Sequence, residues 1–342
     1  MDNQAAAKKI QEIVEELFEQ DKIDMVIGHE TGTVALRNRP YFIRKDDEDR
    51  AEEIKKLTWN SFCSNNIAVF LPKFYEIDPH RKKKDETPKP RIAVTVKGCD
   101  MRSIVALVKE KQIPRDHLQI IGVPCQGMID KRKVEERIGK EEIVEAVEEG
   151  DKLTVKTKSG KTESFPREDV LRPACIECRF PMPEGVDHLL EGEAREPGDG
   201  GYGRIEEFEK QSHDERWNYI KTEIGKCIRC YACRQACPTC YCKECFAEQI
   251  DMKWIGATND FTDNMLFHII RVFHQAGRCV ECDACYDACP QHIDLRTLTK
   301  KMAMDTERLY GYVPDFEAET VPPLSTFKEE DPEQFITDPD KK

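Results

Sequence analysis

Hydrophobic positions recur at helical spacing in several stretches of the chain. Between residues 5 and 20 the apolar side chains lie three or four positions apart, with Glu and Lys between them: Ile10, Ile13, Val14, Leu17 and Phe18. This period predicts an amphipathic helix whose apolar face packs on a core. Similar patterns predict helices over residues 216–224, 264–276 and 302–312, and the alternating charges of residues 45–56 predict a solvated helix.

Shorter apolar runs predict strands at residues 25–27, 33–36 and 41–43, and a hairpin at 152–158 and 161–165. A β-branched run, Arg91 to Val96, is followed by a helical pattern from Met101 to Lys111 and by a second apolar run from Leu118 to Val123. Strand, helix and strand at this spacing predict a βαβ unit with parallel strands. We therefore expect an N-terminal α/β domain with a βαβ-containing sheet.

Two stretches break these patterns. Residues 192–203 hold five glycines and a proline, which is typical of a loop or domain boundary; a phosphate cradle is the weaker interpretation, since the strand-then-helix context is missing. Beyond Tyr312 the chain is rich in Pro and acidic residues. Two interpretations of this tail stay open: disorder, or an extended arm that lies on a partner subunit through Leu324, Phe327, Phe335 and Ile336.

The composition narrows the class of protein. A formal net charge of −13 on 342 residues argues against nucleic-acid binding. No apolar run approaches the roughly 20 residues that span a bilayer, and the first residues lack a signal-peptide pattern, so we expect a cytoplasmic protein without a membrane span. Sixteen cysteines in a reducing compartment indicate metal ligation in place of disulfides, and chemistry of this kind suggests an anaerobe.

Two cysteine runs in the C-terminal half read C-x-x-C-x-x-C-x-x-x-C-P, the spacing that holds a pair of [4Fe–4S] clusters. In such runs the cysteine before the proline ligates the neighbouring cluster. We assign one cluster to a first quartet, Cys227, Cys230, Cys233 and Cys289. We assign another to a second quartet, Cys279, Cys282, Cys285 and Cys237. Zinc ribbons use paired C-x-x-C knuckles instead, so a zinc site or a disulfide framework fits this spacing poorly.

Four earlier cysteines follow predicted strand ends or form a C-x-x-C pair, and we call them the third quartet: Cys99, Cys125, Cys175 and Cys178. The carboxyl ends of parallel strands are where α/β sheets place their sites. The third quartet therefore predicts a third [4Fe–4S] cluster, with a partial site and spare thiols as the alternative.

The remaining cysteines are Cys63, Cys240, Cys242 and Cys245. Two roles are open for them: ligands of another metal site, or free thiols. A lone cysteine such as Cys63 is more often a buried small hydrophobe. For His268 and His274, on the predicted helix 264–276, a structural or surface role is favoured over ligation.

We expect the chain to divide into three parts. These are an α/β domain at 1–205, a mainly α-helical two-[4Fe–4S] ferredoxin-like domain at 206–305 and an extended arm at 306–342.

With Lys97-Gly98-Cys99-Asp100, Gly122-Val123-Pro124-Cys125-Gln126 and Cys175-Ile176-Glu177-Cys178 in place, the chain resembles the coenzyme F420 hydrogenase/dehydrogenase beta-subunit family. The resemblance covers roughly residues 90–300. Residues 227–242 look like the formate-dehydrogenase beta type, and like subunits that accompany heterodisulfide-reductase-like complexes. The family implies an FAD that exchanges a hydride with F420 beside the cluster of the third quartet. Flavin-binding members carry a paired-glycine segment early in the chain, whereas this sequence offers Gly28 and Gly32, separated by three residues.

Two functions follow. The first is an electron-transfer subunit that relays electrons between a hydrogenase- or formate-dehydrogenase-type partner and a heterodisulfide-reductase-like flavoprotein. The second is a catalytic subunit with FAD, acting on F420 or a nicotinamide. The candidate cofactor contacts are Lys97, Asp100, Arg102, Gly198, Gly200, Gly201 and Gly203. We assign no catalytic residue, and whether the chain is itself an enzyme depends on the flavin.

Overall fold

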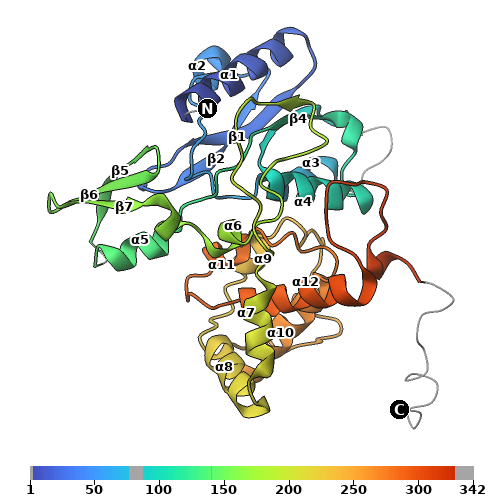
Figure 1. Ribbon diagram of the computed structural model, residues 1–342. Coiled ribbons are helices and arrows are strands. Elements are labelled where there is room, and N and C mark those ends of the chain that lie inside the picture. The colour runs from blue at the N-terminus through green and yellow to red at the C-terminus, as the bar shows by residue number, and fades with distance from the viewer. Residues whose placement is uncertain (1–2, 77–87, 140, 328–342) are drawn as a thin grey trace.

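The computed structural model describes residues 3–76, 88–139 and 141–327, and these form an upper α/β region, a small side sheet and a lower helical region (Figure 1). The α/β region contains α1 (Asn3–Glu19), β1 (Met25–Thr31), β2 (Asn38–Arg44), α2 (Arg50–Ile54), α3 (Leu71–Tyr75), β3 (Ile92–Val96), α4 (Gly98–Lys109), β4 (Leu118–Gly122) and β8 (His188–Leu189). The described part of the chain contains no helix that is long and apolar enough to cross a membrane.

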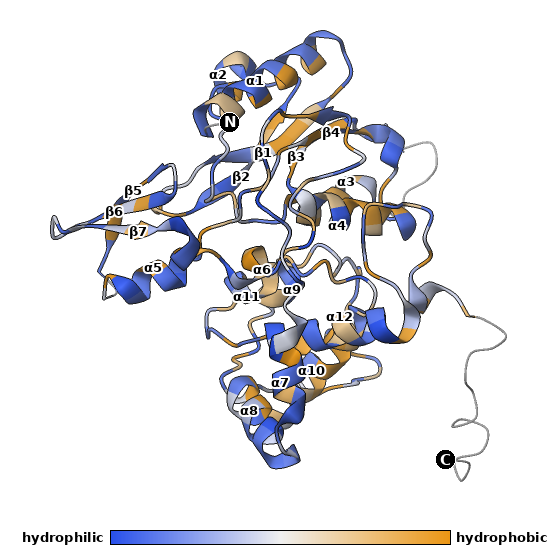
Figure 2. Ribbon diagram, in the orientation of Figure 1, coloured by the Kyte–Doolittle hydropathy of each residue, from blue (hydrophilic) through white to orange (hydrophobic). Residues whose placement is uncertain are grey.

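The main sheet has the order β2-β1-β3-β4-β8 and is mixed, since β1 pairs antiparallel with β2 while the other neighbours are parallel. Successive side chains of a strand point to opposite faces. Val26, Ala93 and Ile121 therefore pack toward α1, and Ile27, Val94 and Ile120 pack toward α3 and α4. Figure 2 shows the resulting apolar strands between helices whose outer faces are polar. Both faces of the sheet are thus covered, which leaves its strand ends as the place for a site.

A second sheet, β5 (Ile143–Glu149), β6 (Lys152–Thr157) and β7 (Thr162–Pro166), is antiparallel and projects to one side with α5 (Lys131–Arg137). Leu153, Val155 and Phe165 bury one face of it against Val134 of α5. Arg167, just after β7, donates hydrogen bonds to the carbonyl oxygens of Gln126 and Gly127 at 2.6 Å each. The side sheet therefore anchors the loop that carries Cys125.

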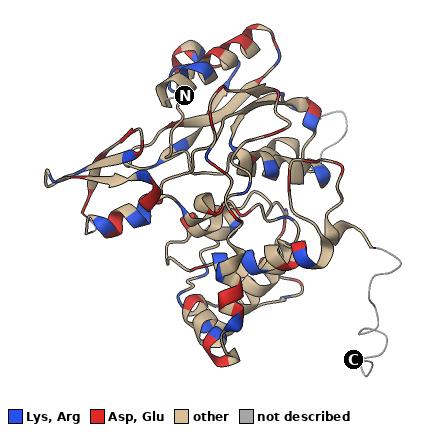
Figure 3. Ribbon diagram, viewed as in Figure 1, with Lys and Arg blue, Asp and Glu red and all other residues tan. Residues whose placement is uncertain are grey.

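The helical region is the cysteine-rich part of the molecule. It comprises α6 (Pro173–Ile176), α7 (Tyr202–Lys210), α8 (His213–Gly225), α9 (Ala232–Gln235), α10 (Phe261–His274), α11 (Ala284–Ala288) and α12 (Arg296–Tyr310). Its small core is centred on Phe267, which is 1% exposed and packs with Ile224, Ile293 and Leu295. Charged residues of both signs are frequent along α7, α8 and α12 (Figure 3).

Most of the elements expected from the sequence are present. The βαβ unit is confirmed, with β3 and β4 in parallel register from Ile92–Leu118 to Val96–Gly122. The amphipathic N-terminal helix and the hairpin are confirmed as well. The strand expected at residues 33–36 is wrong, because this segment is a turn in which Leu36 has a positive φ of 63°. The helix expected over residues 45–56 is limited to the five residues of α2.

The segment after α12 folds back over the α/β region. The Arg102 side chain donates to the carbonyl oxygen of Pro314, and Lys109 donates to the Thr320 hydroxyl at 2.6 Å. α12 itself crosses the expected boundary at 305/306, and α7 crosses the one at 205/206. Leu324 and Phe327 are exposed. Phe335 and Ile336 of the expected arm lie outside the described residues.

Candidate iron–sulfur sites

The two ferredoxin-type runs adopt the same local backbone conformation. In each run, the residues on both sides of the middle cysteine have positive φ: Arg229 (54°) and Tyr231 (60°) flank Cys230, and Glu281 (57°) and Asp283 (56°) flank Cys282. Left-handed conformations in residues with a side chain cost of order 1 kcal/mol each or more. A short helix follows each loop, α9 or α11. The repeated strain at matching positions indicates that each loop is built to curl its thiols inward.

The four thiols of the first quartet line one cavity, together with Phe267, His268 and Ile293. The backbone N–H of Arg229 lies 3.3 Å from Cys227 Sγ, and so does His268 Nε2. N–H groups that point at ligand sulfur are a feature of iron–sulfur sites, where they tune the reduction potential. A structural role was expected for His268, but its position on the predicted helix could not reveal the contact with a thiol.

The second quartet gathers around Cys237, which comes from the other run. The charge of Cys237 contributes to raising the pKa of Cys279, Cys282 and Cys285, after burial as the main cause. In the reverse direction, Cys289 of the second run closes the first quartet. The crossed pairing of the two runs therefore places the first and second quartets next to each other.

The third quartet is assembled from three separate segments, and its four thiols line one cavity at the strand ends. Cys99 follows β3, Cys125 follows β4, and Cys175 and Cys178 lie on and just after α6. Backbone N–H groups again approach sulfur, from Gly127 to Cys125 and from Met128 to Cys175, both at 3.3 Å. The same cavity is lined by Val280, Glu281 and Cys282 of the second run. The third quartet thus adjoins the second.

The chemistry of these thiols fits metal ligation. All sixteen cysteines are free of disulfides. Burial raises the pKa of Cys125, Cys233 and Cys282 to about 12, so each thiol holds its proton at neutral pH until a metal binds it as a thiolate. Within the described ranges, no three His, Cys, Asp or Glu side chains are arranged to hold a single metal ion.

Buried cations beside the quartets lack part of their hydrogen bonding. Arg102 Nη2, at the third-quartet cavity, has no partner among the described residues, nor do Arg229 Nη2 and Arg271 Nε and Nη1, near the ferredoxin quartets. Arg229 also pairs with Asp263, at 3.6 Å, through its other terminal nitrogen. Buried guanidinium groups need negative charge and acceptors around them, and a cluster with four thiolates is anionic. These orphaned donors fit negatively charged groups held by the quartets.

Lys97, Asp100 and Arg102, expected to contact a cofactor, are buried at 3%, 0% and 3% exposure. Lys97 Nζ pairs with Asp100 Oδ2 at 2.8 Å and donates to the Asn65 carbonyl oxygen at 2.9 Å. Arg102 donates to the Val280 carbonyl oxygen at 2.9 Å and lies over the Phe180 ring. Lys97 and Arg102 also line the third-quartet cavity, and Asp100 Oδ1 and Arg102 Nη2 have no partner among the described residues. The other polar atoms of these side chains are engaged within the chain, so their contacts do not by themselves favour a flavin there.

The expected glycine contacts serve chain packing near Cys178. A side chain on Gly198 would lie 2.4 Å from the Ile176 carbonyl oxygen, and one on Gly201 would overlap the Glu177 side chain. Gly200 and Gly201 also have positive φ, at 85° and 68°. Gly203 is the second residue of α7, with open space around it. Close approach to residues 176–179 accounts for Gly198, Gly200 and Gly201 without a ligand, whereas Gly203 has no such contact.

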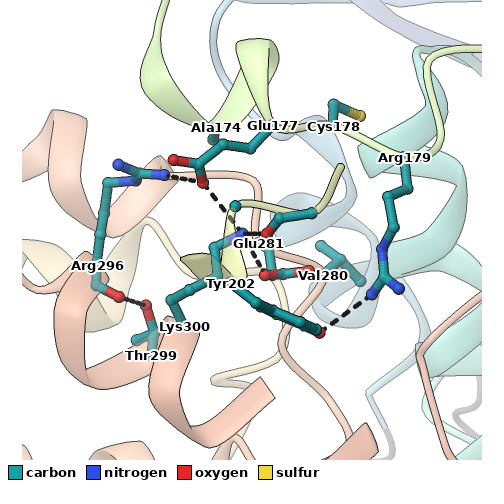
Figure 4. Close-up of polar contacts among 12 residues, drawn as sticks. Ala174, Glu177, Cys178, Arg179, Tyr202, Val280, Glu281, Arg296, Thr299 and Lys300 are labelled. Carbon is teal, nitrogen blue, oxygen red and sulfur yellow. Dashed lines mark hydrogen bonds and ion pairs between the residues drawn. The ribbon is translucent and has the colours of Figure 1, made fainter. Parts of the chain in front are cut away.

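An ion-pair network joins the third-quartet loop to the helical region (Figure 4). Glu177 accepts from Arg296 at 2.6 Å and pairs with Lys300 at 3.3 Å, and Lys300 pairs with Glu281 at 2.5 Å. Arg296 also pairs with Asp283, at 2.8 Å. Because Glu281 and Asp283 flank Cys282, this network fixes the third quartet relative to the second.

The remaining cysteines occupy different surroundings. Cys63 is fully buried in the core of the α/β region, where it accepts a hydrogen bond from Asn38, so the expectation of a buried small hydrophobe is met. Cys240 lies beside Cys237 and accepts from Gln275 Nε2 at 3.3 Å. Cys242 is exposed and Cys245 is half-buried. Cys240 is thus in contact with a quartet residue.

A family model that describes the C-terminal part of the beta chain of coenzyme F420 hydrogenase/dehydrogenase matches residues 90–189. The F420-dependent formate dehydrogenase subunit beta of Methanocaldococcus jannaschii is 25% identical over 295 residues, covering 68% of this chain and 76% of the relative. The F420-dependent formate dehydrogenase 1 subunit beta of Methanococcus maripaludis is 26% identical over 299 residues, covering 68% and 75%.

Among solved structures, a chain of the F420-reducing [NiFe] hydrogenase complex from Methanosarcina barkeri matches with 15% identity and a TM-score of 0.35, covering 52% of this chain and 58% of that one. The matched stretch 90–189 contains the βαβ unit and all four cysteines of the third quartet. These sequence matches support the coenzyme F420 hydrogenase/dehydrogenase beta-subunit family for this chain, with the family model itself covering residues 90–189.

Proposed function

We propose that this protein is an iron–sulfur electron-transfer subunit of a multi-subunit oxidoreductase complex. The observation that carries the proposal is the adjacency of the three cysteine quartets. The first and second exchange Cys289 and Cys237, and the third shares a cavity lining with Cys282 of the second. Each quartet would hold a [4Fe–4S] cluster, and three such clusters in a row would supply one-electron transfer across the molecule.

The protein's own residues hold this path in place. Backbone N–H groups point at the sulfurs of Cys125, Cys175 and Cys227. Arg132 of α5 donates to the carbonyl oxygens of Tyr286 and Cys289 at 2.7 Å each, which ties the side-sheet region to the second run. Rigid spacing between the quartets is what a relay needs.

The two ends of the path differ in exposure, which supports separate partners. At the first quartet, Cys230 is exposed and the neighbouring Ile228 is half exposed. The thiols of the third quartet are half-buried, beside the α/β region. The relatives named as formate dehydrogenase beta subunits support a formate-dehydrogenase- or hydrogenase-type partner. We propose a heterodisulfide-reductase-like flavoprotein as the second partner, on the likeness of residues 227–242.

The alternative is a catalytic subunit that binds FAD and acts on F420 or a nicotinamide. The F420-dependent relatives favour it. The engagement of Lys97 with Asp100, and of Arg102 with backbone carbonyl oxygens, favours the relay.

Cofactor analysis of anaerobically purified protein separates the two functions. The relay predicts iron and acid-labile sulfide without flavin released on acid treatment. Stoichiometric flavin in that supernatant would contradict the pure relay and support the catalytic subunit. A chain that binds no iron under these conditions would contradict both.

A further inference from the structure

Helix α10 has an unusual distribution of side chains. Four polar residues spaced along one face are almost fully buried: Asn264, His268, Arg271 and, at the C-cap, Gln275, with exposures of 1%, 1%, 3% and 4%. Phe267 and Val272 of the helix are buried as well, but the apolar residues Leu266, Ile269 and Phe273 are 39%, 40% and 59% exposed. A helix that only packed on a core would bury the apolar side chains and expose the polar ones. The buried polar stripe therefore needs another reason.

The stripe follows the two ferredoxin quartets in order. Asn264 donates to the Cys227 carbonyl oxygen at 2.7 Å, and His268 Nε2 lies 3.3 Å from Cys227 Sγ. Arg271 Nη2 donates to the Cys233 carbonyl oxygen at 3.0 Å. Gln275 lies 3.6 Å from Cys237 Sγ. The stripe thus begins at the first quartet and ends at the second, with Arg271 between them.

Arg271 is the only one of the four with a permanent charge, and that charge acts on both quartets. Its Nη2 group is bound at Cys233 of the first quartet, and Gln275, one turn further along α10, lies at Cys237 of the second. The guanidinium interacts electrostatically with Cys233, with Cys237 and Cys285, and with Cys240, which lies beside Cys237. Its Nε and Nη1 groups have no partner among the described residues.

His268 behaves differently. Unlike Arg271, it carries no permanent charge, and its Nε2 lies 3.3 Å from Cys227 Sγ of the first quartet. It therefore provides a comparison within the same helix face: a group without a permanent charge at one quartet, and a charged group between two.

We propose that Arg271 is a shared positioning residue for the two ferredoxin-type clusters, whose fixed positive charge raises both reduction potentials together. Charge and hydrogen bonding near a cluster set its potential. Adding an electron to either cluster increases its negative charge, and a buried cation beside both favours that step at both sites. The segment between the two cysteine runs contains α10 and so places Arg271 beside both. This inference rests on the proposed function.

The test is an EPR-monitored redox titration of full-length, anaerobically purified protein, with iron per chain measured on the same samples. In Arg271→Met we expect reduction of both ferredoxin-type clusters to become about tenfold less favourable, a fall of about 59 mV in each potential. The potential of the third cluster, which Arg271 does not face, serves as the internal reference and stays unchanged. Arg271→Lys, which keeps the charge, restores both potentials toward the wild-type values.

His268→Leu is the matched variant on the same helix face, and it should shift one of the two potentials only. If Arg271→Met loses iron, Arg271→Gln takes its place. Loss of iron from both neutral variants but not from Arg271→Lys also supports the inference, because the lysine keeps the charge.

Three results would overturn the inference: a shift in one potential only, no shift at full iron content, or iron loss from all three Arg271 variants. A wild-type protein without clusters in the first and second quartets would contradict the proposed function itself. The two failures are therefore distinguishable.

Discussion

The ferredoxin-type quartets and the third quartet reach similar arrangements by different routes. Each ferredoxin-type loop sets its own geometry within seven residues, with left-handed residues on both sides of the middle cysteine and a short helix after it. The third quartet draws Cys99, Cys125 and the Cys175–Cys178 pair from segments that only the sheet and the side sheet bring together. One site is encoded locally, and the other is a consequence of the tertiary fold.

This difference decides what each site depends on. A locally encoded loop tolerates changes elsewhere as long as its backbone can curl. A site at strand ends inherits any disturbance of the elements that bring its segments together. The Arg296 network is the link between them, because it ties Glu177 of the third-quartet loop to Asp283 of the second run. Variants of the third quartet, of the ferredoxin-type loops and of the Arg296 network should therefore have separable effects on iron content and stability.

The largest effect is expected from removing a ligand of the third quartet. Cys125→Ser should lower iron by about four per chain, the content of one cubane, and leave the ferredoxin-type EPR signals in place. Cys63→Ala is the matched control, since Cys63 is a buried cysteine of the same core that the ligand assignment leaves out. Unchanged iron in Cys125→Ser would remove Cys125 from the ligand set.

The link between the regions comes next. Arg296→Met leaves Asp283 buried at 7% exposure without its ion pair, and weakens the hold on Glu177. Breaking a buried pair in this way costs about 3–5 kcal/mol. Arg308→Met is the control, because its pair with Glu206 is 48% exposed on both sides and is worth about 0–1 kcal/mol. Equal denaturation midpoints for the two variants would argue against the network as a structural link.

A smaller effect is expected at the start of α4. A side chain on Gly98 would meet the Phe180 carbonyl oxygen at 1.8 Å, so Gly98→Ala must move Cys99 or the segment after Cys178. We expect a loss of about 1–3 kcal/mol in stability and reduced loading of the third quartet only. Gly225→Ala, at a position with open space, should change neither quantity. Equal iron loss from all quartets would show that the regions are not separable.

The smallest effect concerns pH and the core of the α/β region. Burial, and then the nearby Lys97 charge, lower the pKa of His29 to about 3, below the roughly 6.5 of an unfolded chain. As the pH falls below about 6.5, His29 takes up a proton in the unfolded state but not in the folded state. The free energy of unfolding therefore decreases by up to about 1.4 kcal/mol per pH unit.

In His29→Leu this contribution to the pH slope should disappear. Urea unfolding of the α/β region, followed by Trp59 fluorescence between about pH 6.5 and 5, measures it. The same slope in the variant and in the wild type would show that another group is responsible.

The sequence predicts the locally encoded features well. The period of α1, the βαβ unit and the hairpin follow from spacing alone, and the structure has them. The short apolar run at residues 33–36 predicts a strand, yet this segment is a turn and Leu36 packs into the side-sheet core. The strand β8, of two residues, pairs with β4 only through tertiary contacts and carries no periodic signal.

The candidate sites likewise include features that the sequence predicts and features that only the tertiary structure reveals. The two ferredoxin-type runs predict their own grouping, while the neighbours that surround them could not be foreseen. Arg271 and His268 look like ordinary members of an amphipathic helix, and only the packing of α10 shows that their face is buried against thiols. The glycines near residue 200 suggested a ligand, whereas backbone packing against Glu177 and Ile176 accounts for them.

The most direct test of the central claim is the iron and acid-labile sulfide content of anaerobically purified wild-type protein. Three filled quartets predict about twelve of each per chain, falling to about eight in Cys125→Ser. About eight in the wild type, unchanged in Cys125→Ser, would contradict the third cluster and with it a relay that extends into the α/β region.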